Sequence, residues 1–391
     1  MSLSSGGATV MEFEYTETHE MIRKSVREFA EKELAPESAH YDETQETPVH
    51  WMKKMAEMGL TGMAIPTDYG GAGLDYISYS IAVEELSRVD ASAGVMIGVN
   101  NGLACEPLYK WGTEEQKRKY LTLVASGQWV GAYALTEPGA GSDAAALTST
   151  AELKGGEWHL NGSKIFVTNG YMAKLLITYA RTDPGTGPKG ISAFIVPDTA
   201  AGYQRVKKEN KLGIRASDTE LIAFDDCRIP EDHLLGTRGE GFKIAMATLD
   251  VGRIGIASQA LGIAQAAFEA AVKYSKERKA FGGPISNLQA IQFKIADMAT
   301  QIDAARLLTH RACWMKDQGM RHTTESSMAK LFASEMCKRV VDQALQIHGG
   351  YGFVKDYPVE RYFRDQKITE LYEGTSEIQR LVIARGLLRG N

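Results

Sequence analysis

The stretch EWHLNGSKIFV, residues 157–167, decides the fold class. Its two short runs of apolar and aromatic residues flank Asn161-Gly162-Ser163, and this arrangement predicts two strands joined by a tight turn. Three later runs have the same character: LLITYA (175–180), GISAFIVP (190–197) and ELIAFDDCRI (220–229). We therefore expect residues 127–240 to form a β-sheet domain.

Helical patterns lie on both sides of this region. Before it, apolar residues recur at helical spacing, and Pro36 is expected to end the first run. The further helices expected on the N-terminal side are 48–59, 75–88 and 113–126. Those expected on the C-terminal side are 241–278, 287–318, 323–348 and 358–390, the last interrupted near Glu373. Because long helices with short connections form bundles, the sequence predicts an α+β fold. Its parts are a tag or disordered tail (1–10), an α-helical domain (11–126), the β-sheet domain (127–240) and a C-terminal four-helix bundle (241–391).

The composition is that of an ordinary globular protein. The 391 residues have a formal net charge of −5, and 24% of them are charged. This balance lacks the basic character typical of nucleic-acid binders, and no apolar run is long enough to predict membrane insertion. The four cysteines show no metal-ligand spacing, so we expect free thiols, a reducing compartment and no metal site. A cytoplasmic location follows, or the mitochondrial matrix if a targeting segment has been removed.

Several common enzyme motifs are absent from the sequence. The loops GGAGLD (70–75) and PGAGSD (138–143) lack the third glycine and the strand–helix context of a nicotinamide-binding fingerprint. The chain also has no GxxxxGK[ST], HExxH or GxSxG segment, so phosphoryl transfer, zinc proteolysis and α/β-hydrolase chemistry lack their signatures.

Three segments are candidates for a functional site. The loop YALTEPGAGSD (133–143) offers backbone amides and hydroxyls to a polar ring or to phosphates, although glycine-rich connections are common. In KIFVTNG (164–170), Phe166 and Thr168 are expected on one side of a strand, where they suit a planar ligand or simply the core. In LYEGTSEIQR (371–380), Glu373 is a candidate base, or else a solvated or capping glutamate.

Together, in a helix–sheet–helix chain, these three segments resemble the acyl-CoA dehydrogenase family of flavoproteins. The resemblance extends from about Met11 to Arg389, and 249–265 and 372–384 are most similar to the short-chain, butyryl-CoA branch. It implies FAD-dependent oxidation of an acyl-CoA to the trans-2-enoyl-CoA. In that reaction Glu373 takes the α-proton, and the β-hydrogen leaves as hydride to flavin N5. Gly252 stands where the isovaleryl branch carries its base, so the base is assigned to Glu373.

The resemblance also implies the ligand contacts. FAD would be bound by Tyr133, Leu135, Thr136, Gly141, Ser142, Phe166, Thr168, Arg278, Phe281, Gln289, Gln346, Gly349, Gly350, Thr375 and Glu377. The segment 346–350 would reach it across a subunit interface. Acyl-CoA would be bound by Ser142, Asp250, Arg253, Gly374 and Arg385. Two positions depart from related branches: Ala280 replaces a threonine, and His348 replaces an apolar residue.

The implied partners are a short-chain acyl-CoA, an electron-transferring flavoprotein as acceptor, and three further copies in a homotetramer. The glutaryl branch of the family carries an arginine for the distal carboxylate of its substrate, whereas VMIGVNNGLA (95–104) has none, so the resemblance implies a neutral, short acyl chain. Two alternatives remain open: an acyl-CoA oxidase or other oxygen-using flavin enzyme on the same fold, and a non-catalytic acyl-CoA-binding scaffold.

Overall fold

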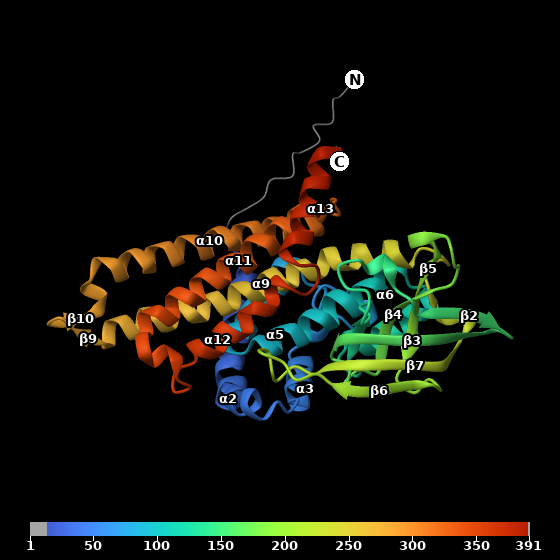
Figure 1. Ribbon diagram of the computed structural model, residues 1–391, viewed down its shortest axis with the longest axis horizontal. Helices are drawn as coiled ribbons and strands as arrows, with labels where there is room; N and C mark the ends of the chain where they lie inside the picture. The colour runs from blue at the N-terminus through green and yellow to red at the C-terminus, as the bar shows by residue number, and fades with distance from the viewer. Residues whose placement is uncertain (1–13, 390–391) are drawn as a thin grey trace, which may run out of the picture.

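The computed structural model describes residues 14–389, and the expected tail at residues 1–10 lies outside them. Figure 1 shows helices at the start of the chain, then a β-sheet, then a set of long helices that returns across the first ones. This order is the one that the sequence predicts.

The N-terminal part is helical throughout. Its elements are α1 (Glu17–Phe29), η1 (Ala30–Leu34), α2 (Ala35–Thr44), α3 (Val49–Glu57), η2 (Leu60–Gly62), η3 (Thr67–Tyr69), α4 (Tyr76–Val89), α5 (Ala91–Gly98), η4 (Val99–Cys105), α6 (Glu106–Trp111), α7 (Glu114–Gln116), η5 (Lys117–Leu121) and α8 (Thr122–Ala125). The prediction that Pro36 ends the first helix is wrong. A π-helical turn, η1, precedes the proline, which therefore stands in the first turn of α2, where its missing N–H is tolerated.

The middle part is an eight-stranded sheet in the order β6-β7-β3-β2-β4-β5-β8, with β1 paired in parallel to β4. The strands are β1 (Gly131–Ala134), β2 (Thr150–Lys154), β3 (Glu157–Thr168), β4 (Leu175–Arg181), β5 (Ile191–Pro197), β6 (Tyr203–Lys208), β7 (Thr219–Pro230) and β8 (Leu234–Leu235), with η6 (Ala144–Ala146), η7 (Gly187–Gly190) and η8 (Glu231–His233) between them.

The predicted turn at Asn161-Gly162-Ser163 is wrong, because β3 runs through it as a single strand. The pairing with β7 shifts register between Leu160 and Gly162, so the Asn-Gly pair makes a bulge. At Gly162 φ is +141°, and a Cβ there would lie 2.3 Å from Ser149 Oγ. The tight turn instead lies one strand earlier, at Gly155-Gly156 between β2 and β3.

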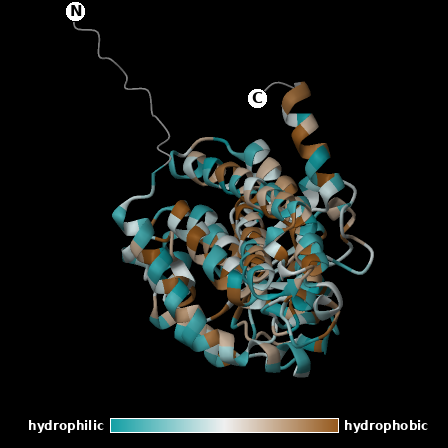
Figure 2. Cartoon of the chain, turned by 90° about the vertical axis from the view of Figure 1, so that its left-hand side faces the viewer, coloured by the Kyte–Doolittle hydropathy of each residue, from teal (hydrophilic) through white to brown (hydrophobic). Residues whose placement is uncertain are grey.

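The C-terminal part contains three long helices that pack on one another, and two of them, α9 and α10, also pack on α4. Its elements are α9 (Gly241–Glu277), β9 (Lys279–Ala280), β10 (Gly283–Pro284), η9 (Ile285–Asn287), α10 (Gln289–Asp317), α11 (Thr323–His348), η10 (Gly349–Phe353), α12 (Val359–Asp365), η11 (Gln366–Glu370) and α13 (Ser376–Arg389). The fourth expected helix, 358–390, is divided into α12, η11 and α13, with the predicted interruption between η11 and α13. In Figure 2 apolar residues lie mainly between the helices, and they also occur on α13, which packs against α11 near the C-terminus.

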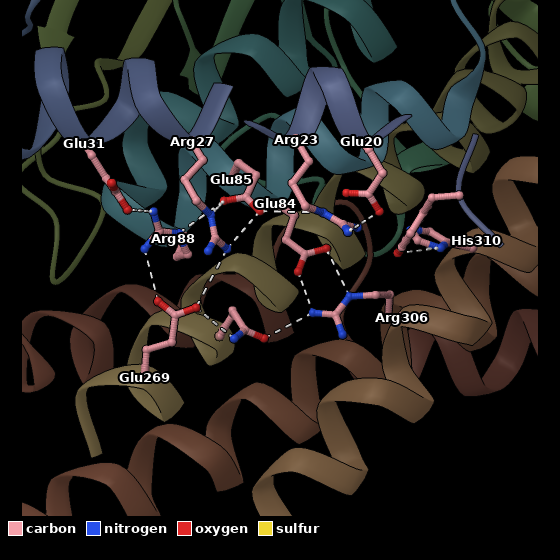
Figure 3. Close-up of polar contacts among 12 residues, drawn as sticks. Glu20, Arg23, Arg27, Glu31, Glu84, Glu85, Arg88, Glu269, Arg306 and His310 are labelled. Atoms are coloured by element: carbon pink, nitrogen blue, oxygen red, sulfur yellow. Dashed lines mark hydrogen bonds and ion pairs between the residues drawn. The ribbon is translucent and has the colours of Figure 1, made fainter. Parts of the chain in front are cut away.

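A network of charged side chains fixes α1 to this bundle (Figure 3). Glu84 and Glu85 of α4 are both buried. Glu85 accepts hydrogen bonds from Arg27 of α1 at 2.8 Å and from Arg88 at 3.2 Å, and Glu84 accepts one from Arg306 of α10 at 2.6 Å. Each buried carboxylate thus has an arginine partner from another element, which offsets part of its desolvation.

Candidate functional site

A pocket of about 920 Å³ lies where the sheet meets the two helical parts. Its wall combines the loop after β1, the end of β3, residues 209–214, α9, and residues 371–385. Segments that are far apart in the sequence therefore form one site, and all three candidate segments contribute to it.

Glu373 stands on the wall of this pocket with an unusual backbone conformation. Its φ is +53°, and Gly374 follows with φ +96°. A left-handed glutamate is uncommon, and such strain is found most often at functional sites. The carboxylate atom Oε2 is buried and has no hydrogen-bond partner among the described residues.

The surroundings of Glu373 change its acidity. Burial raises the pKa of Glu373 to about 7, although the positive charges of Lys330 and Arg253 oppose the rise. A carboxylate with this pKa is suited to accept a proton at neutral pH. Gly252 of α9 makes room for it, because a Cβ at that position would lie 2.0 Å from Glu373 Oε2.

A buried ion pair supports the glycine-rich loop. Lys164 of β3 donates to Glu137 Oε1 at 2.7 Å and to the Leu135 carbonyl at 3.2 Å. Glu137 also accepts hydrogen bonds from the backbone N–H groups of Thr148 and Ser149. Burial is the largest single effect on the pKa of Glu137, and it raises this pKa. The Lys164 charge and the hydrogen bonds together outweigh burial and lower the pKa to about 2. The first half of the loop is therefore fastened to β3 and to the residues just before β2.

Within the loop, the backbone is open toward solvent space. A Cβ built on Gly139 or Gly141 would meet no atom within 4 Å. Thr136 and Ser142 place hydroxyl groups on the pocket wall nearby. The loop thus offers open backbone and two hydroxyl-bearing residues at the pocket wall, and its binding of a ligand stays a prediction.

Phe166 and Thr168 both line the pocket, but not through simple alternation along a strand. The β3–β7 register shifts a second time between Lys164 and Val167, and Phe166 has φ +60°. The second bulge leaves the Phe166 side chain 62% exposed. A flat aromatic face is therefore available to a ligand in the pocket.

The structure brings together most of the residues selected from the sequence. Those that line the pocket are Tyr133, Leu135, Thr136, Gly141, Ser142, Phe166, Thr168, Arg253, Glu373, Gly374, Thr375 and Arg385. Asp250 and Glu377 are not part of the wall. Asp250 accepts hydrogen bonds from Arg253 at 2.7 Å and from Thr323 at 2.6 Å, so its place is beside the arginine that faces the pocket.

The other selected residues lie at the end of the bundle opposite the sheet, near β9 and β10 in Figure 1. They are Arg278, Phe281, Gln289, Gln346, Gly349 and Gly350. None of them lines the pocket of the same chain. His348, beside them, is buried, stacks on Tyr274 with ring centroids 4.3 Å apart, and shares a 2.8 Å hydrogen bond with the Ala344 carbonyl. It therefore packs within its own chain.

Sequence reasoning missed other residues of the site. Lys330 of α11 is fully buried, and its Nζ donates to the Gly374 carbonyl at 2.8 Å. Leu103 and residues 209–214 also belong to the wall. A lysine in a helical pattern is typical of a solvated side chain, so the sequence offers no signal for Lys330.

Three sequence models of one family match the chain: the acyl-CoA dehydrogenase N-terminal domain at residues 16–128, the middle domain at 132–227 and the C-terminal domain at 239–388. The chain belongs to the acyl-CoA dehydrogenase family. This confirms the family and the fold class expected from the sequence, and it makes the chain a member of a flavoprotein family of oxidoreductases.

Individual relatives agree with this assignment. The short-chain specific acyl-CoA dehydrogenase of Mus musculus mitochondria is 54% identical over 376 residues, which cover 96% of this chain and 91% of that protein. Butyryl-CoA dehydrogenase from Megasphaera elsdenii has a TM-score of 0.96 at 43% identity, over 97% of this chain and 100% of that one. A chain from a structure of the electron transferring flavoprotein of Acidaminococcus fermentans, concerned with flavin-based electron bifurcation, has a TM-score of 0.96 at 50% identity over the same shares.

Three further findings concern residues 14–389. No helix in this range has the length and apolar character needed to cross a bilayer. Nor does any group of three His, Cys, Asp or Glu side chains in the same range come together as a metal site would require. The four cysteines are buried and free, as expected.

Proposed function

We propose that this acyl-CoA dehydrogenase oxidises a short-chain acyl-CoA to the trans-2-enoyl-CoA, with Glu373 as the base that removes the α-proton. The observation that carries the proposal is the unpartnered Glu373 carboxylate on the pocket wall, with its pKa raised to about 7. The thioester group lowers the free-energy barrier to removal of the α-proton only in part. A carboxylate that is half ionised near neutral pH, and already desolvated, lowers much of what remains of this barrier.

The pocket residues fit FAD. Hydroxyls of Thr136, Ser142 and Thr168, the open backbone at Gly141 and the exposed face of Phe166 match a flat ring system with polar edges. Tyr133, Leu135 and Thr375 complete the set proposed to hold it. When bound, FAD supplies the acceptor for the β-hydride.

The remaining proposed contacts would come from a second copy of the chain. Arg278, Phe281, Gln289, Gln346, Gly349 and Gly350 are remote from their own pocket, and Phe281 is 93% exposed. An exposed aromatic residue beside an arginine suits a partner's bound cofactor, since arginine pairs well with pyrophosphate oxygens. We therefore propose a homotetramer in which subunits complete one another's FAD sites. Glu377, at the start of α13, is proposed as a further FAD contact.

On the substrate side, the chain's own residues orient the thioester. Gly374 lines the pocket beside the base, and the Glu373 N–H is proposed to donate to the thioester carbonyl and so stabilise the developing enolate. Three residues of the wall, Ser142, Arg253 and Arg385, are proposed to contact the CoA part. Asp250 holds Arg253 in place through a hydrogen bond. Entry of the substrate would displace water from the pocket and strengthen these interactions.

A short acyl chain is proposed because the similar proteins named above act on short-chain and butyryl substrates by name. Leu103 lines the pocket close to Gly252, where a Cβ would lie 2.8 Å from the Leu103 side chain, and so adds an apolar wall near Glu373. An electron-transferring flavoprotein is the proposed acceptor, in keeping with the Acidaminococcus fermentans structure.

The test is the visible spectrum of the purified protein, followed by anaerobic titration with butyryl-CoA. We expect a bound-flavin band that bleaches in the wild type but persists in Glu373→Gln, which should still bind FAD and acyl-CoA. Glu115→Gln, an exposed glutamate on α7, is the matched control and should bleach.

The other outcomes separate the alternatives. Rapid reoxidation of the bleached flavin by air would favour an oxidase. A flavin that butyryl-CoA and longer or branched acyl-CoAs all fail to bleach would reject the proposed substrate class. A protein that cannot be reconstituted with FAD would favour the non-catalytic scaffold.

A further inference from the structure

Lys330 is a buried lysine directly beneath the turn that carries the base. It belongs to α11, and none of its surface is exposed. Its Nζ donates a hydrogen bond to the Gly374 carbonyl at 2.8 Å. Burying an ammonium group is expensive unless it is paired, so its presence beside the catalytic turn calls for a reason.

The carbonyl that Lys330 holds belongs to a strained segment. Glu373 and Gly374 both have positive φ, at +53° and +96°. The same carbonyl also accepts a hydrogen bond from Gln379 Nε2 at 2.8 Å, and this amide lies 3.2 Å from the Glu373 carbonyl oxygen. Two consecutive left-handed residues persist only where their surroundings fix them, and two donors on one carbonyl do so.

Lys330 also acts through its charge. Two charged groups lie around Glu373: Lys330 of α11 and Arg253 of α9. The other titratable groups around it are neutral phenols, those of Tyr79, Tyr133 and Tyr372. Around Lys330, the carboxylates of Glu370 and Glu377 add to that of Glu373, while Arg253 opposes them. Burial lowers the pKa of Lys330 to about 8, so it is still protonated where Glu373 titrates.

We propose that Lys330 is the positioning residue of the base, because it anchors the Gly374 carbonyl and sets a positive charge beside the Glu373 carboxylate. The inference rests on the proposed function, since it gives Lys330 a role in proton removal by Glu373. Lys330 itself touches neither reacting atoms nor cofactor in this assignment.

The test compares Lys330→Met with Lys338→Met in the holoenzyme. Lys338 lies on the same helix with an exposed side chain, so it is a matched control for the substitution. The positive charge of Lys330 lowers the pKa of Glu373, and the loss of a nearby opposite charge typically raises a carboxyl pKa by about 1 unit or more. We therefore expect the pH profile of kcat in Lys330→Met to move up by about 1 pH unit or more. At pH 7 the ionised fraction of Glu373, and with it kcat, should fall about fivefold or more, with the deficit shrinking as the pH is raised and KM changing much less.

A second measurement does not depend on turnover. pH-difference infrared spectra report the Glu373 carboxyl band, which is identified by its loss in Glu373→Gln. The midpoint of this band should move up in Lys330→Met and in Lys330→Gln, the smaller polar variant that serves if the methionine variant does not fold, and it should stay fixed in Lys338→Met.

The outcomes are separable. If the wild type oxidises butyryl-CoA but both Lys330 variants keep its pH profile and its infrared midpoint, the inference about Lys330 is wrong and the proposed function stands. A loss of kcat that is equal at every pH, with an unmoved midpoint, also overturns it. If the wild type oxidises no acyl-CoA, the proposed function fails first.

Discussion

Replacing Glu373 with Gln should stabilise the folded chain at alkaline pH and have a much smaller effect near pH 5. The reason is the pKa of Glu373, which burial raises from 4.5 to about 7 in the folded state. Between these two values the folded chain binds more protons than the unfolded chain. The free energy of unfolding of the wild type therefore falls as the pH rises from about 4.5 to about 7 through this one group.

The magnitude follows from the size of the shift. At about 1.36 kcal/mol per pKa unit, the full penalty above pH 7 is about 3 kcal/mol. Because the residue keeps some exposure toward the pocket, we expect about 2 kcal/mol of it between about pH 5 and about pH 8. The neutral amide in Glu373→Gln would carry no such pH-dependent penalty. The free energy of unfolding of the variant, relative to that of the wild type, should therefore rise by this amount across that interval.

The assay is denaturant or thermal unfolding of the wild type, Glu373→Gln and Glu115→Gln at both pH values, with FAD and protein concentrations held constant. The exposed Glu115 control should follow the wild type at each pH. A stability difference between Glu373→Gln and the wild type that stays the same at both pH values would show that Glu373 is not destabilised as a buried carboxylate, and would refute the reasoning.

Three further substitutions test other parts of the structure. Gly252→Ala places a Cβ 2.0 Å from Glu373 Oε2 and should lower kcat about 100-fold with the fold retained, as seen in turnover and circular dichroism; activity near the wild-type level would show that the base has room to move. Glu85→Ala removes the buried carboxylate that pairs with Arg23, Arg27 and Arg88 in Figure 3 and should cost about 3 kcal/mol in urea unfolding, whereas a loss below about 1 kcal/mol would mean that the network contributes little. Glu137→Gln breaks the buried pair with Lys164 and should destabilise the chain by about 3 kcal/mol at neutral pH and weaken FAD retention. Since the folded pKa of Glu137 is about 2, that stability difference should vanish as the pH falls from about 4.5 to about 2, and a difference independent of pH would contradict the ion-pair account.

Much of the fold follows from local sequence pattern. The helix expected at 323–348 begins and ends where α11 does, and those at 241–278 and 287–318 differ from α9 and α10 by one or two residues at their ends. These helices are long, and glycines mark their limits, such as Gly241 at the start of α9 and Gly349 after α11, so the sequence indicates their extent.

The errors occur where tertiary contacts override local preference. Asn161-Gly162 has the chemistry of a turn, but pairing with β2 on one side and β7 on the other keeps β3 extended, and the glycine is used to clear Ser149. Pro36 has the chemistry of a helix break, but the π-turn before it lets the chain start a new helical segment.

The candidate site also contains residues that the sequence indicates and contacts that it does not. Glu373 and the loop from Tyr133 to Ser142 could be selected because glycine, proline and a helix interruption mark them in the sequence. The dependence of Glu373 on Gly252 and Lys330 could not, because those contacts join α9 and α11 to the turn and exist only in three dimensions. The role of the distant group around Arg278 stays a prediction, since a single chain does not bring it to a pocket.

The most direct test of the central claim is exchange of the α-hydrogen of butyryl-CoA with solvent deuterium, followed by mass spectrometry. If Glu373 is the base, the wild type should introduce deuterium at Cα, and Glu373→Gln should do so at least about 100-fold more slowly while still binding the thioester. Exchange at the wild-type rate in Glu373→Gln would assign proton removal to another group and contradict the account.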